Sequence, residues 1–301
     1  MTLFIIFLIG LCLGSFLNVV IDRWPKNKSV VTGRSHCDFC KKTLSPLDLI
    51  PVISYLFLRG KCRYCHKKLS WQYPLVEFAT GVLLVLTYLL TINLQQFNNL
   101  TNSIDLNVIV FGMRLISLFV LTLYFIVIFM VDLKYEIILE RVINSAIILT
   151  VFCHLIILLL FYLKIFVYYD TAPYHSIFSY PLIWSPFKTV LFSMLINFLT
   201  GIIVALFFRF LIFVSRGRGL GEGDIKLGFW LGLLLGFPNI LPGMFLAFVS
   251  GGIVGLFLVM TKIKKFGQTV PLAPFLVSGS YIAFFFGEKI ISWYLKTYLI
   301  F

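Results

Sequence analysis

Acidic residues are scarce in this sequence. Only 12 Asp and Glu occur among 301 residues, against 25 Lys and Arg, and all charged residues together make up 12 % of the chain. Since about a quarter of the residues in a soluble domain are charged, this shortage excludes an ordinary soluble domain. Two of the few acids stand together between glycines in "GLGEGDIKL", residues 219–227, at the edge of an apolar run. Such a placement calls for an explanation.

The sequence also lacks the alternation of polar and apolar residues that a transmembrane β-barrel requires. Its mean hydropathy is +1.00, and its apolar residues gather in runs of about 20, enough for a helix to cross roughly 30 Å of hydrocarbon. A helix satisfies its own backbone hydrogen bonds there. We therefore predict an all-α polytopic membrane protein with about eight transmembrane segments. They cover residues 2–21, 72–92, 108–131, 142–163, 189–213, 225–238, 241–261 and 271–295.

Two of these segments need comment. The sixth, 225–238, is short and interrupted by Gly and Pro, so a re-entrant segment is an alternative to a full span. The first has no Lys or Arg before it and no A-x-A cleavage signal after it. A signal peptide has a basic start and a cleavage signal, and since both are missing here we expect a retained transmembrane helix.

Positive charge concentrates between the first two segments, where residues 22–71 carry eleven Lys or Arg against three Asp. Because cytoplasmic loops are rich in Lys and Arg, this loop is predicted to be cytoplasmic, and eight spans then leave both termini outside. We expect three parts: a first transmembrane helix (1–21), a cytoplasmic zinc-binding loop (22–71) and a core of about seven helices (72–301).

The net charge of +13 raises the alternative of nucleic-acid binding. However, the basic residues lie beside membrane segments, where they set topology and meet anionic lipid headgroups. We expect anionic lipids as partners and no nucleic acid.

Two pairs of cysteines with CxxC spacing occur in the polar loop, in "HCDFCKK" and "KCRYCHKK", separated by 21 residues. Two such turns can direct four thiolates at one structural Zn²⁺, and the spacing is close to that of four-cysteine zinc ribbons. The alternative is a pair of disulfides, which the reducing cytoplasm disfavours. The two flanking histidines are not needed as ligands. The predicted ligands are Cys37, Cys40, Cys62 and Cys65.

Two acids mark the predicted cytoplasmic edge of the membrane: Asp132 ends the third segment and Asp224 opens the sixth. A carboxylate in this position usually belongs to a functional site or a paired charge. Two facing carboxyls cannot both ionise easily, so one keeps a proton while the other acts as a base toward water. The chain lacks GxSxG and HExxH motifs, so we predict an aspartic catalytic pair.

Two alternatives stay open at this point. In the first, the acids form salt bridges with nearby basic residues, namely Lys134, Arg141, Lys226 or Arg218. The surrounding glycines favour a site over a surface ion pair, because they permit unusual dihedral angles and close approach of a substrate. In the second, the chain is an ion-coupled secondary transporter that uses Asp132 and Asp224. Transporter sites lie near the midplane between repeats, whereas these acids lie at one face.

Five stretches occur in an order that resembles the type IV prepilin peptidases, a family of membrane aspartic peptidases with a GxGD motif. They are "GSFLNVVIDRWP" (14–25), the paired CxxC loop, "WQYPLVEFATG" (71–81), "DLKYEIILE" (132–140) and "GEGDIKL" (221–227).

The resemblance implies a bacterial inner-membrane endopeptidase that removes the basic leader of type IV prepilins or pseudopilins after a glycine, at the cytoplasmic face. It places the catalytic pair on Asp132 and Asp224. It also implies N-methylation of the new N-terminus with S-adenosylmethionine as methyl donor, and associates Glu77 with that activity.

The same resemblance suggests substrate contacts around the second aspartate. The candidates are Gly221, Glu222, Gly223, Lys226 and Glu140. The chain departs from the family pattern at Leu139 and Glu140, where the family's first aspartate motif usually continues to Pro-Asp. This departure leaves the role of Glu140 open.

Overall fold

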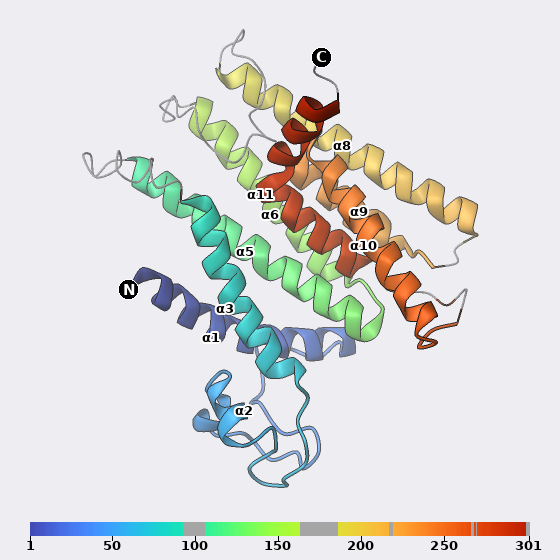
Figure 1. The fold of residues 1–301 in the computed structure, drawn as a ribbon. Helices are drawn as coiled ribbons and strands as arrows, with labels where there is room; N and C mark the ends of the chain where they lie inside the picture. The colour runs from blue at the N-terminus through green and yellow to red at the C-terminus, as the bar shows by residue number, and fades with distance from the viewer. Residues whose placement is uncertain (93–105, 163–185, 217–218, 266–267, 269, 299–301) are drawn as a thin grey trace. The chain divides into compact units, whose positions relative to one another are not determined.

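The structure is a computed structural model that describes residues 1–92, 106–162, 186–216, 219–265, 268 and 270–298 (Figure 1). In these residues the chain is built from helices, and the extended backbone is limited to two isolated bridges. The α-helices are α1 (Thr2–Arg23), α2 (Ile53–Phe57), α3 (Gln72–Thr91), α5 (Leu106–Tyr135), α6 (Glu140–Tyr162), α8 (Pro186–Ser215), α9 (Glu222–Leu235), α10 (Ile240–Met260) and α11 (Ala273–Tyr298). Two short 3-10 helices, η1 (Trp24–Lys26) and η2 (Pro46–Leu49), lie between α1 and α3.

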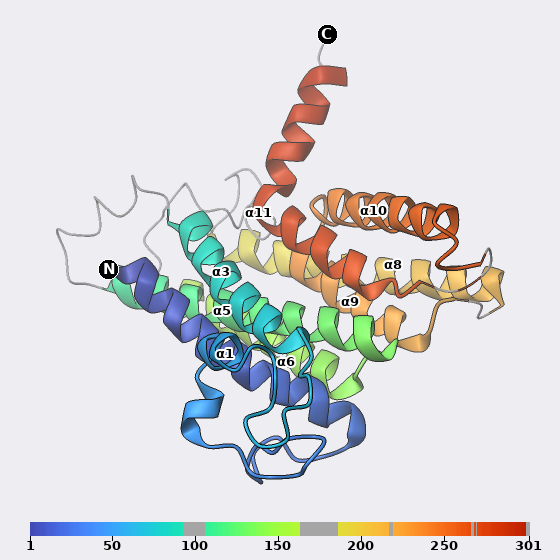
Figure 2. The same ribbon diagram turned by 60° about the horizontal axis from the view of Figure 1, so that its bottom comes forward.

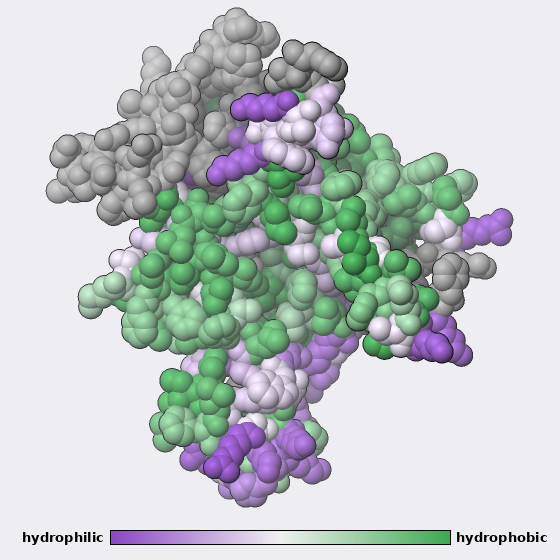
Figure 3. Space-filling model, in the orientation of Figure 1, coloured by the Kyte–Doolittle hydropathy of each residue, from purple (hydrophilic) through white to green (hydrophobic). Residues whose placement is uncertain are grey.

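The prediction of an all-helical polytopic membrane protein is confirmed. Each predicted apolar segment coincides with a long helix or with α9, and seven helices of the described chain are long and apolar enough to cross a membrane. In Figure 3 most of the surface of these helices is green, the colour of hydrophobic residues. Purple side chains gather at the ends, above all on the loop between α1 and α3.

The sixth predicted segment, 225–238, is not one of these seven helices. It forms α9, which has 14 residues and is about 21 Å long at 1.5 Å per residue, shorter than the roughly 30 Å of a bilayer core. The helix ends at Gly236, whose φ of 64° is a conformation that favours glycine. Nine of its residues are buried, so α9 is covered by protein. Sequence hydropathy does not distinguish burial in protein from burial in lipid.

The chain divides into two compact units, Met1–Val127 and Ile128–Phe301. In the first unit, α1 and α3 pack along each other, as Figures 1 and 2 show. Their contact depends on glycines: a Cβ atom on Gly10 would lie 2.6 Å from the Cα atom of Gly81, and one on Gly14 would lie 2.6 Å from the Cα atom of Glu77. Gly10 and Gly14 have the small-xxx-small spacing that lets membrane helices approach closely.

The loop between α1 and α3, residues 24–71, is called the cysteine loop below. Its start is held by Arg23, whose guanidinium donates hydrogen bonds to the carbonyl oxygens of Ser29, Thr32 and Arg34 at 3.1–3.3 Å. Its end is held by Tyr73, whose hydroxyl donates to Asp22 on α1 at 3.0 Å. The cysteine loop is therefore anchored at both membrane helices that carry it.

In the second unit, α9 packs against α8, and α10 packs against α11. Trp230 of α9 is fully buried, and its indole Nε1–H donates to Thr150 Oγ1 of α6 at 2.9 Å. The close approach of α8 and α9 again requires glycine, because a Cβ atom on Gly232 would lie 2.7 Å from the Cα atom of Gly201. This packing fixes the start of α9, where Asp224 lies.

The glycine contact of the first unit gives a testable prediction. Gly10→Ala places a methyl group against the backbone of Gly81, so we expect a loss of about 1–3 kcal/mol, as for other overpacked sites. Thermal unfolding in detergent measures it as a lower midpoint. The control is Gly252→Ala in α10, where an added Cβ meets nothing within 4 Å. An unchanged midpoint for Gly10→Ala would contradict the tight helix crossing.

Candidate functional site

The two CxxC turns of the cysteine loop have the same backbone conformation. The N–H of Cys37 donates to the carbonyl of Lys42 at 3.0 Å, and the N–H of Cys62 donates to that of Lys67 at 2.9 Å. The residue after each second cysteine has a positive φ, 58° at Lys41 and 53° at His66. The loop is thus built from two equivalent turns, which the similar sequences "CDFCKK" and "CRYCHK" explain.

The two turns bring their sulfur atoms together. The four Sγ atoms all lie within 4.8 Å of one another, and Cys37 Sγ lies 3.9 Å from Cys65 Sγ. In a tetrahedral site with Zn–S bonds of about 2.3 Å, sulfur atoms lie roughly 3.8 Å apart, so the geometry fits a metal ion. The cysteines are free, so the disulfide alternative is not found. The cluster consists of Cys37, Cys40, Cys62 and Cys65.

The electrostatics of the cluster favour thiolate at Cys62 and disfavour it at Cys65: the backbone N–H of Lys67 lowers the pKa of Cys65, but burial and the neighbouring cysteines raise it to about 11. Burial by itself raises the pKa of a thiol, but the backbone N–H groups of Cys65 and Tyr64 lower the pKa of Cys62 to about 7. A thiolate is the form that binds metal. The flanking histidines are not part of the cluster, and His36 Nδ1 lies 3.3 Å from the carbonyl oxygen of Arg34.

Side chains brace one turn against the other. The ammonium of Lys42 lies 4.3 Å from the ring centre of Tyr64, and that of Lys67 lies 5.1 Å from the ring centre of Phe39. These are cation–π contacts. Each lysine comes from one turn and each ring from the other, so the pair of contacts repeats the symmetry of the turns.

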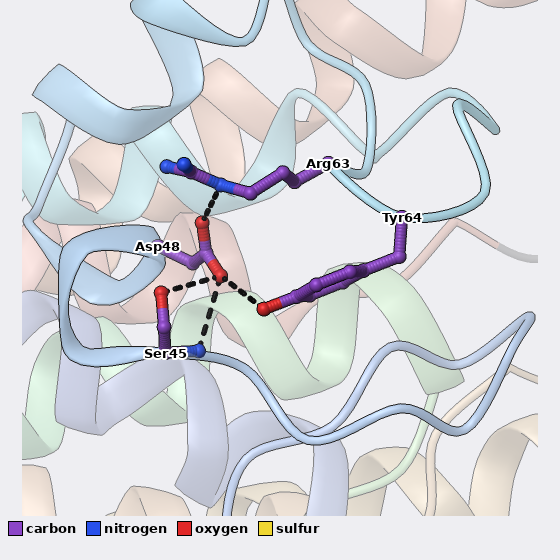
Figure 4. A network of polar contacts seen from close by, with 4 residues as sticks. All are labelled: Ser45, Asp48, Arg63 and Tyr64. Atoms are coloured by element: carbon purple, nitrogen blue, oxygen red, sulfur yellow. Dashed lines mark hydrogen bonds and ion pairs between the residues drawn. The ribbon is translucent and has the colours of Figure 1, made fainter.

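Asp48 connects the second turn to the rest of the cysteine loop (Figure 4). Its side chain is only 3 % exposed. Its carboxylate accepts hydrogen bonds from the N–H and hydroxyl of Ser45 at 3.0 and 2.8 Å, from Arg63 Nε at 2.6 Å and from the Tyr64 hydroxyl at 3.4 Å. Burial raises the pKa of Asp48, but these hydrogen bonds and the Arg63 charge hold it below its usual range. Asp48 was not among the predicted site residues, although S-P-L-D has the spacing of a capping box.

Glu77 ties the cysteine loop to α3. It is buried in the second turn of α3, and its Oε2 accepts the backbone N–H of Val52 at 2.7 Å. Val52 has φ 59° and ψ −48°, and the N–H of Ile53 bonds to the carbonyl of Pro51. These features define a γ-turn, a rare and strained conformation for a β-branched residue. The Glu77 carboxylate therefore holds a strained backbone in place.

Asp132 lies in the last turn of α5 and is buried. Its Oδ2 accepts the backbone N–H of Ala273 at 3.2 Å. Ala273 is the first residue of α11, so its N–H has no partner within that helix, and the helix dipole favours a negative charge there. The contact with α11 brings together residues 141 positions apart and has no signal in the sequence.

Asp224 lies in the first turn of α9 and is also buried. Its Oδ2 accepts the N–H of Gly221 at 2.9 Å, while its own N–H donates to the Gly221 carbonyl at 3.0 Å. Asp224 thus caps the helix in which it lies. The two aspartates are close enough for the charge of Asp224 to act on Asp132. The structure therefore brings together the two acids that the sequence analysis singled out.

Neither aspartate forms a salt bridge within the described chain. Lys226 instead binds Glu140 at 2.5 Å, with both side chains exposed. The salt-bridge alternative is thus not found for these acids with Lys134, Arg141 or Lys226, and Arg218 lies outside the described residues.

The glycines in and just before the GxGD motif, residues 221–224, differ in what they do. Gly219 has a φ of 93°, which favours glycine. Gly221 is extended, with φ −109° and ψ 169°, and Gly223 lies within α9. A Cβ atom on Gly223 would lie 2.7 Å from Cβ of Ile138. The expectation of unusual dihedral angles is therefore wrong for the two glycines of the motif, and Gly223 serves close packing instead. Glu222, between them, is exposed.

Comparisons with known proteins show which family this chain resembles. Residues 8–91 match the model of the bacterial peptidase A24 N-terminal domain. A prepilin leader peptidase/N-methyltransferase of Bacillus subtilis is 30 % identical over 302 residues, which cover 98 % of both chains. One of Pseudomonas aeruginosa is 24 % identical over 312 residues, covering 96 % of this chain and 92 % of the relative. No solved structure matches the chain significantly.

The Asp48 network predicts a stability effect in the cysteine loop. Asp48→Asn leaves Arg63 without its carboxylate partner, at a cost of about 1–3 kcal/mol, so proteolysis of the loop should become faster. Because the folded-state pKa of Asp48 is lowered, its contribution is fully present above an unfolded pKa of about 3.9. The difference from the wild-type chain should thus be constant between about pH 5 and 8.

The matched control is Asp38→Asn, which removes an exposed carboxylate from the first CxxC turn of the same loop. Equal proteolysis rates for the two variants would show that the Asp48 network does not stabilise the loop.

Proposed function

Because this chain belongs to the prepilin leader peptidase/N-methyltransferase family, we propose that it cleaves the basic leader of type IV prepilins or pseudopilins after a glycine and then methylates the new N-terminus. The observation that carries the peptidase assignment is the buried pair of Asp132 and Asp224. The family membership supports the substrate class.

The geometry of the pair supports an aspartic mechanism. One oxygen of each carboxylate is held by a backbone N–H, from Ala273 and from Gly221. No hydrogen bond of the described residues engages the other oxygen, Oδ1, of either acid. These second oxygens are suited to hold a water molecule and the scissile carbonyl between them, which is the task of an aspartic pair.

The reaction then follows from the charge of the pair. Two neighbouring carboxyls share one proton, so one is neutral and the other is charged. The charged carboxylate takes a proton from water as its oxygen attacks the carbonyl carbon, and the neutral acid gives its proton to the carbonyl oxygen. When the tetrahedral carbon collapses, the C–N bond breaks and the leaving amine takes up a proton from the pair.

The positions of the acids support cleavage at a membrane surface. Asp132 lies three residues before the end of α5, and Asp224 lies in the first turn of α9. The charge distribution of the sequence supports the cytoplasmic side of the bacterial inner membrane. A prepilin with an apolar segment in the bilayer would present its leader at this level.

The four-cysteine cluster is proposed to hold a structural Zn²⁺. Its sulfur separations fit tetrahedral coordination, and four thiolates leave no open position for a substrate or water. Cys37, Cys40, Cys62 and Cys65 would hold the ion, which would fold the loop without entering the reaction.

The methyl transfer is assigned to the cysteine loop and the start of α3. S-adenosylmethionine, when bound, supplies an electrophilic methyl group on a positively charged sulfonium. The buried carboxylate of Glu77 fits that charge, and its hydrogen bond to Val52 joins the loop to the membrane helix. Glu77 would thereby position the loop backbone.

The catalytic pair gives the first test of the proposal. Asp132→Asn and Asp224→Asn should each abolish leader cleavage, because one neutral and one charged carboxyl are both required. Cleavage of a co-expressed prepilin is followed by mass spectrometry of its N-terminus, which also reports methylation. Glu222→Gln, in the same turn as Asp224, should retain measurable cleavage. Full cleavage by either Asn variant would refute the assignment.

The metal gives a second test. Purified protein should contain about one zinc per chain, and Cys37→Ser combined with Cys40→Ser should lose it. Elemental analysis measures the metal content. The loop of the variant should become protease-sensitive and cleavage should be impaired. An unchanged zinc content in the double variant would place the metal elsewhere.

The leader's positive charge gives a third test. Lys226 already pairs with Glu140, and the cysteine loop is basic, so the exposed Glu222 is the better candidate to contact a Lys-rich leader. An exposed contact is worth under about 1 kcal/mol. Glu222→Lys should therefore raise the apparent KM several-fold for a basic leader, and less for a leader with neutral residues in place of lysine. Equal effects on both peptides would mean that the leader is bound elsewhere.

A further inference from the structure

The short helix α2 of the cysteine loop exposes an apolar face. Ile53, Leu56 and Phe57 have the i, i+3, i+4 spacing that puts side chains on one side of a helix. All three are exposed, Leu56 at 62 % and Phe57 at 84 %. Tyr55 is buried and points the other way, toward the ring of Trp71 at 5.4 Å. In Figure 3 green side chains cover the place that α2 takes in Figure 1, beside the purple side chains of the rest of the loop.

Two contacts place α2 at the level where α3 enters the membrane. Val52, directly before α2, donates its N–H to Glu77. Glu77 lies five residues into α3, about 7.5 Å along the helix axis at 1.5 Å per residue. Trp71, which α2 contacts through Tyr55, directly precedes α3 and is 72 % exposed. An exposed Trp at the end of a membrane helix is typical of the interface between hydrocarbon and headgroups.

The charges beside this face suit the same environment. Arg59 and Lys61 follow α2 directly, and both are exposed. A short apolar face next to basic side chains is the pattern of a helix that lies in the plane of the membrane surface, with cations at the level of anionic headgroups. The hydrogen bond between Glu77 of α3 and Val52 holds the start of α2 against α3, and the γ-turn at Val52 sets the direction of α2.

We propose that α2 is an interfacial helix, and that Ile53, Leu56 and Phe57 insert into the lipid surface beside the start of α3. The lipid surface then becomes a third support of the cysteine loop, in addition to α1 and α3. The inference concerns the membrane and does not depend on the catalytic role of the aspartates.

A photo-crosslinking experiment tests this proposal on the full chain in nanodiscs that contain phosphatidylglycerol. The probe is p-benzoylphenylalanine in place of Phe57. The matched control carries the same probe in place of Phe39, an exposed phenylalanine on the first CxxC turn of the same loop. Mass spectrometry identifies what each probe captures. Zinc content equal to that of the wild-type chain verifies that each variant is folded.

The expected result is a lipid adduct at position 57 with a yield about fivefold or more above that at position 39, as for a side chain inserted in the interface. Equal lipid yields at the two positions, or capture of another part of this chain or of an added prepilin at position 57, would overturn the proposal. The same probe at position 56 gives an independent reading if the position 57 variant is not folded.

Discussion

Backbone N–H groups at helix starts hold the buried acids of this chain, and the arrangement of both units depends on this interaction. The first N–H groups of a helix lack partners within the helix, and the helix dipole favours negative charge there. A carboxylate that leaves water is stabilised by such a donor. Four pairs share this pattern: Asp48 with Ser45, Glu77 with Val52, Asp132 with Ala273 and Asp224 with Gly221. Asp48 and Asp224 thus cap the helices in which they lie, and Glu77 and Asp132 join one segment to the start of another.

Close helix packing is the second requirement, because the acids are useful only if the helices that carry them are held firmly. Glycine allows the backbones to meet, at Gly10 and Gly81 in one unit and at Gly201 and Gly232 in the other. In a membrane, where apolar side chains gain little by leaving lipid, such contacts supply much of the packing energy. Gly223 belongs to the same class, since it makes room for Ile138 next to Asp224.

Local sequence patterns predicted part of the structure of the cysteine loop. Two CxxC turns at a ribbon-like spacing were sufficient to predict four ligands around one centre, and the sulfur atoms do lie together. The cross-bracing of the two turns by Lys42 and Lys67 was not predicted, because it depends on how one turn faces the other. The same is true of Asp48, whose capping pattern was readable but whose contact with Arg63 was not.

The sequence by itself determined the class of the protein and its helices and singled out the two aspartates as candidates, because hydropathy, CxxC spacing and the GxGD context are local properties of the chain. Only the tertiary structure decided that α9 is buried in protein, that Lys226 pairs with Glu140, and that Asp132 is held by the first N–H of α11. These features depend on contacts between residues far apart in the chain. The physical reason is that burial and hydrogen bonding are set by which helices meet, and hydropathy is the same for a helix that faces lipid and one that faces protein.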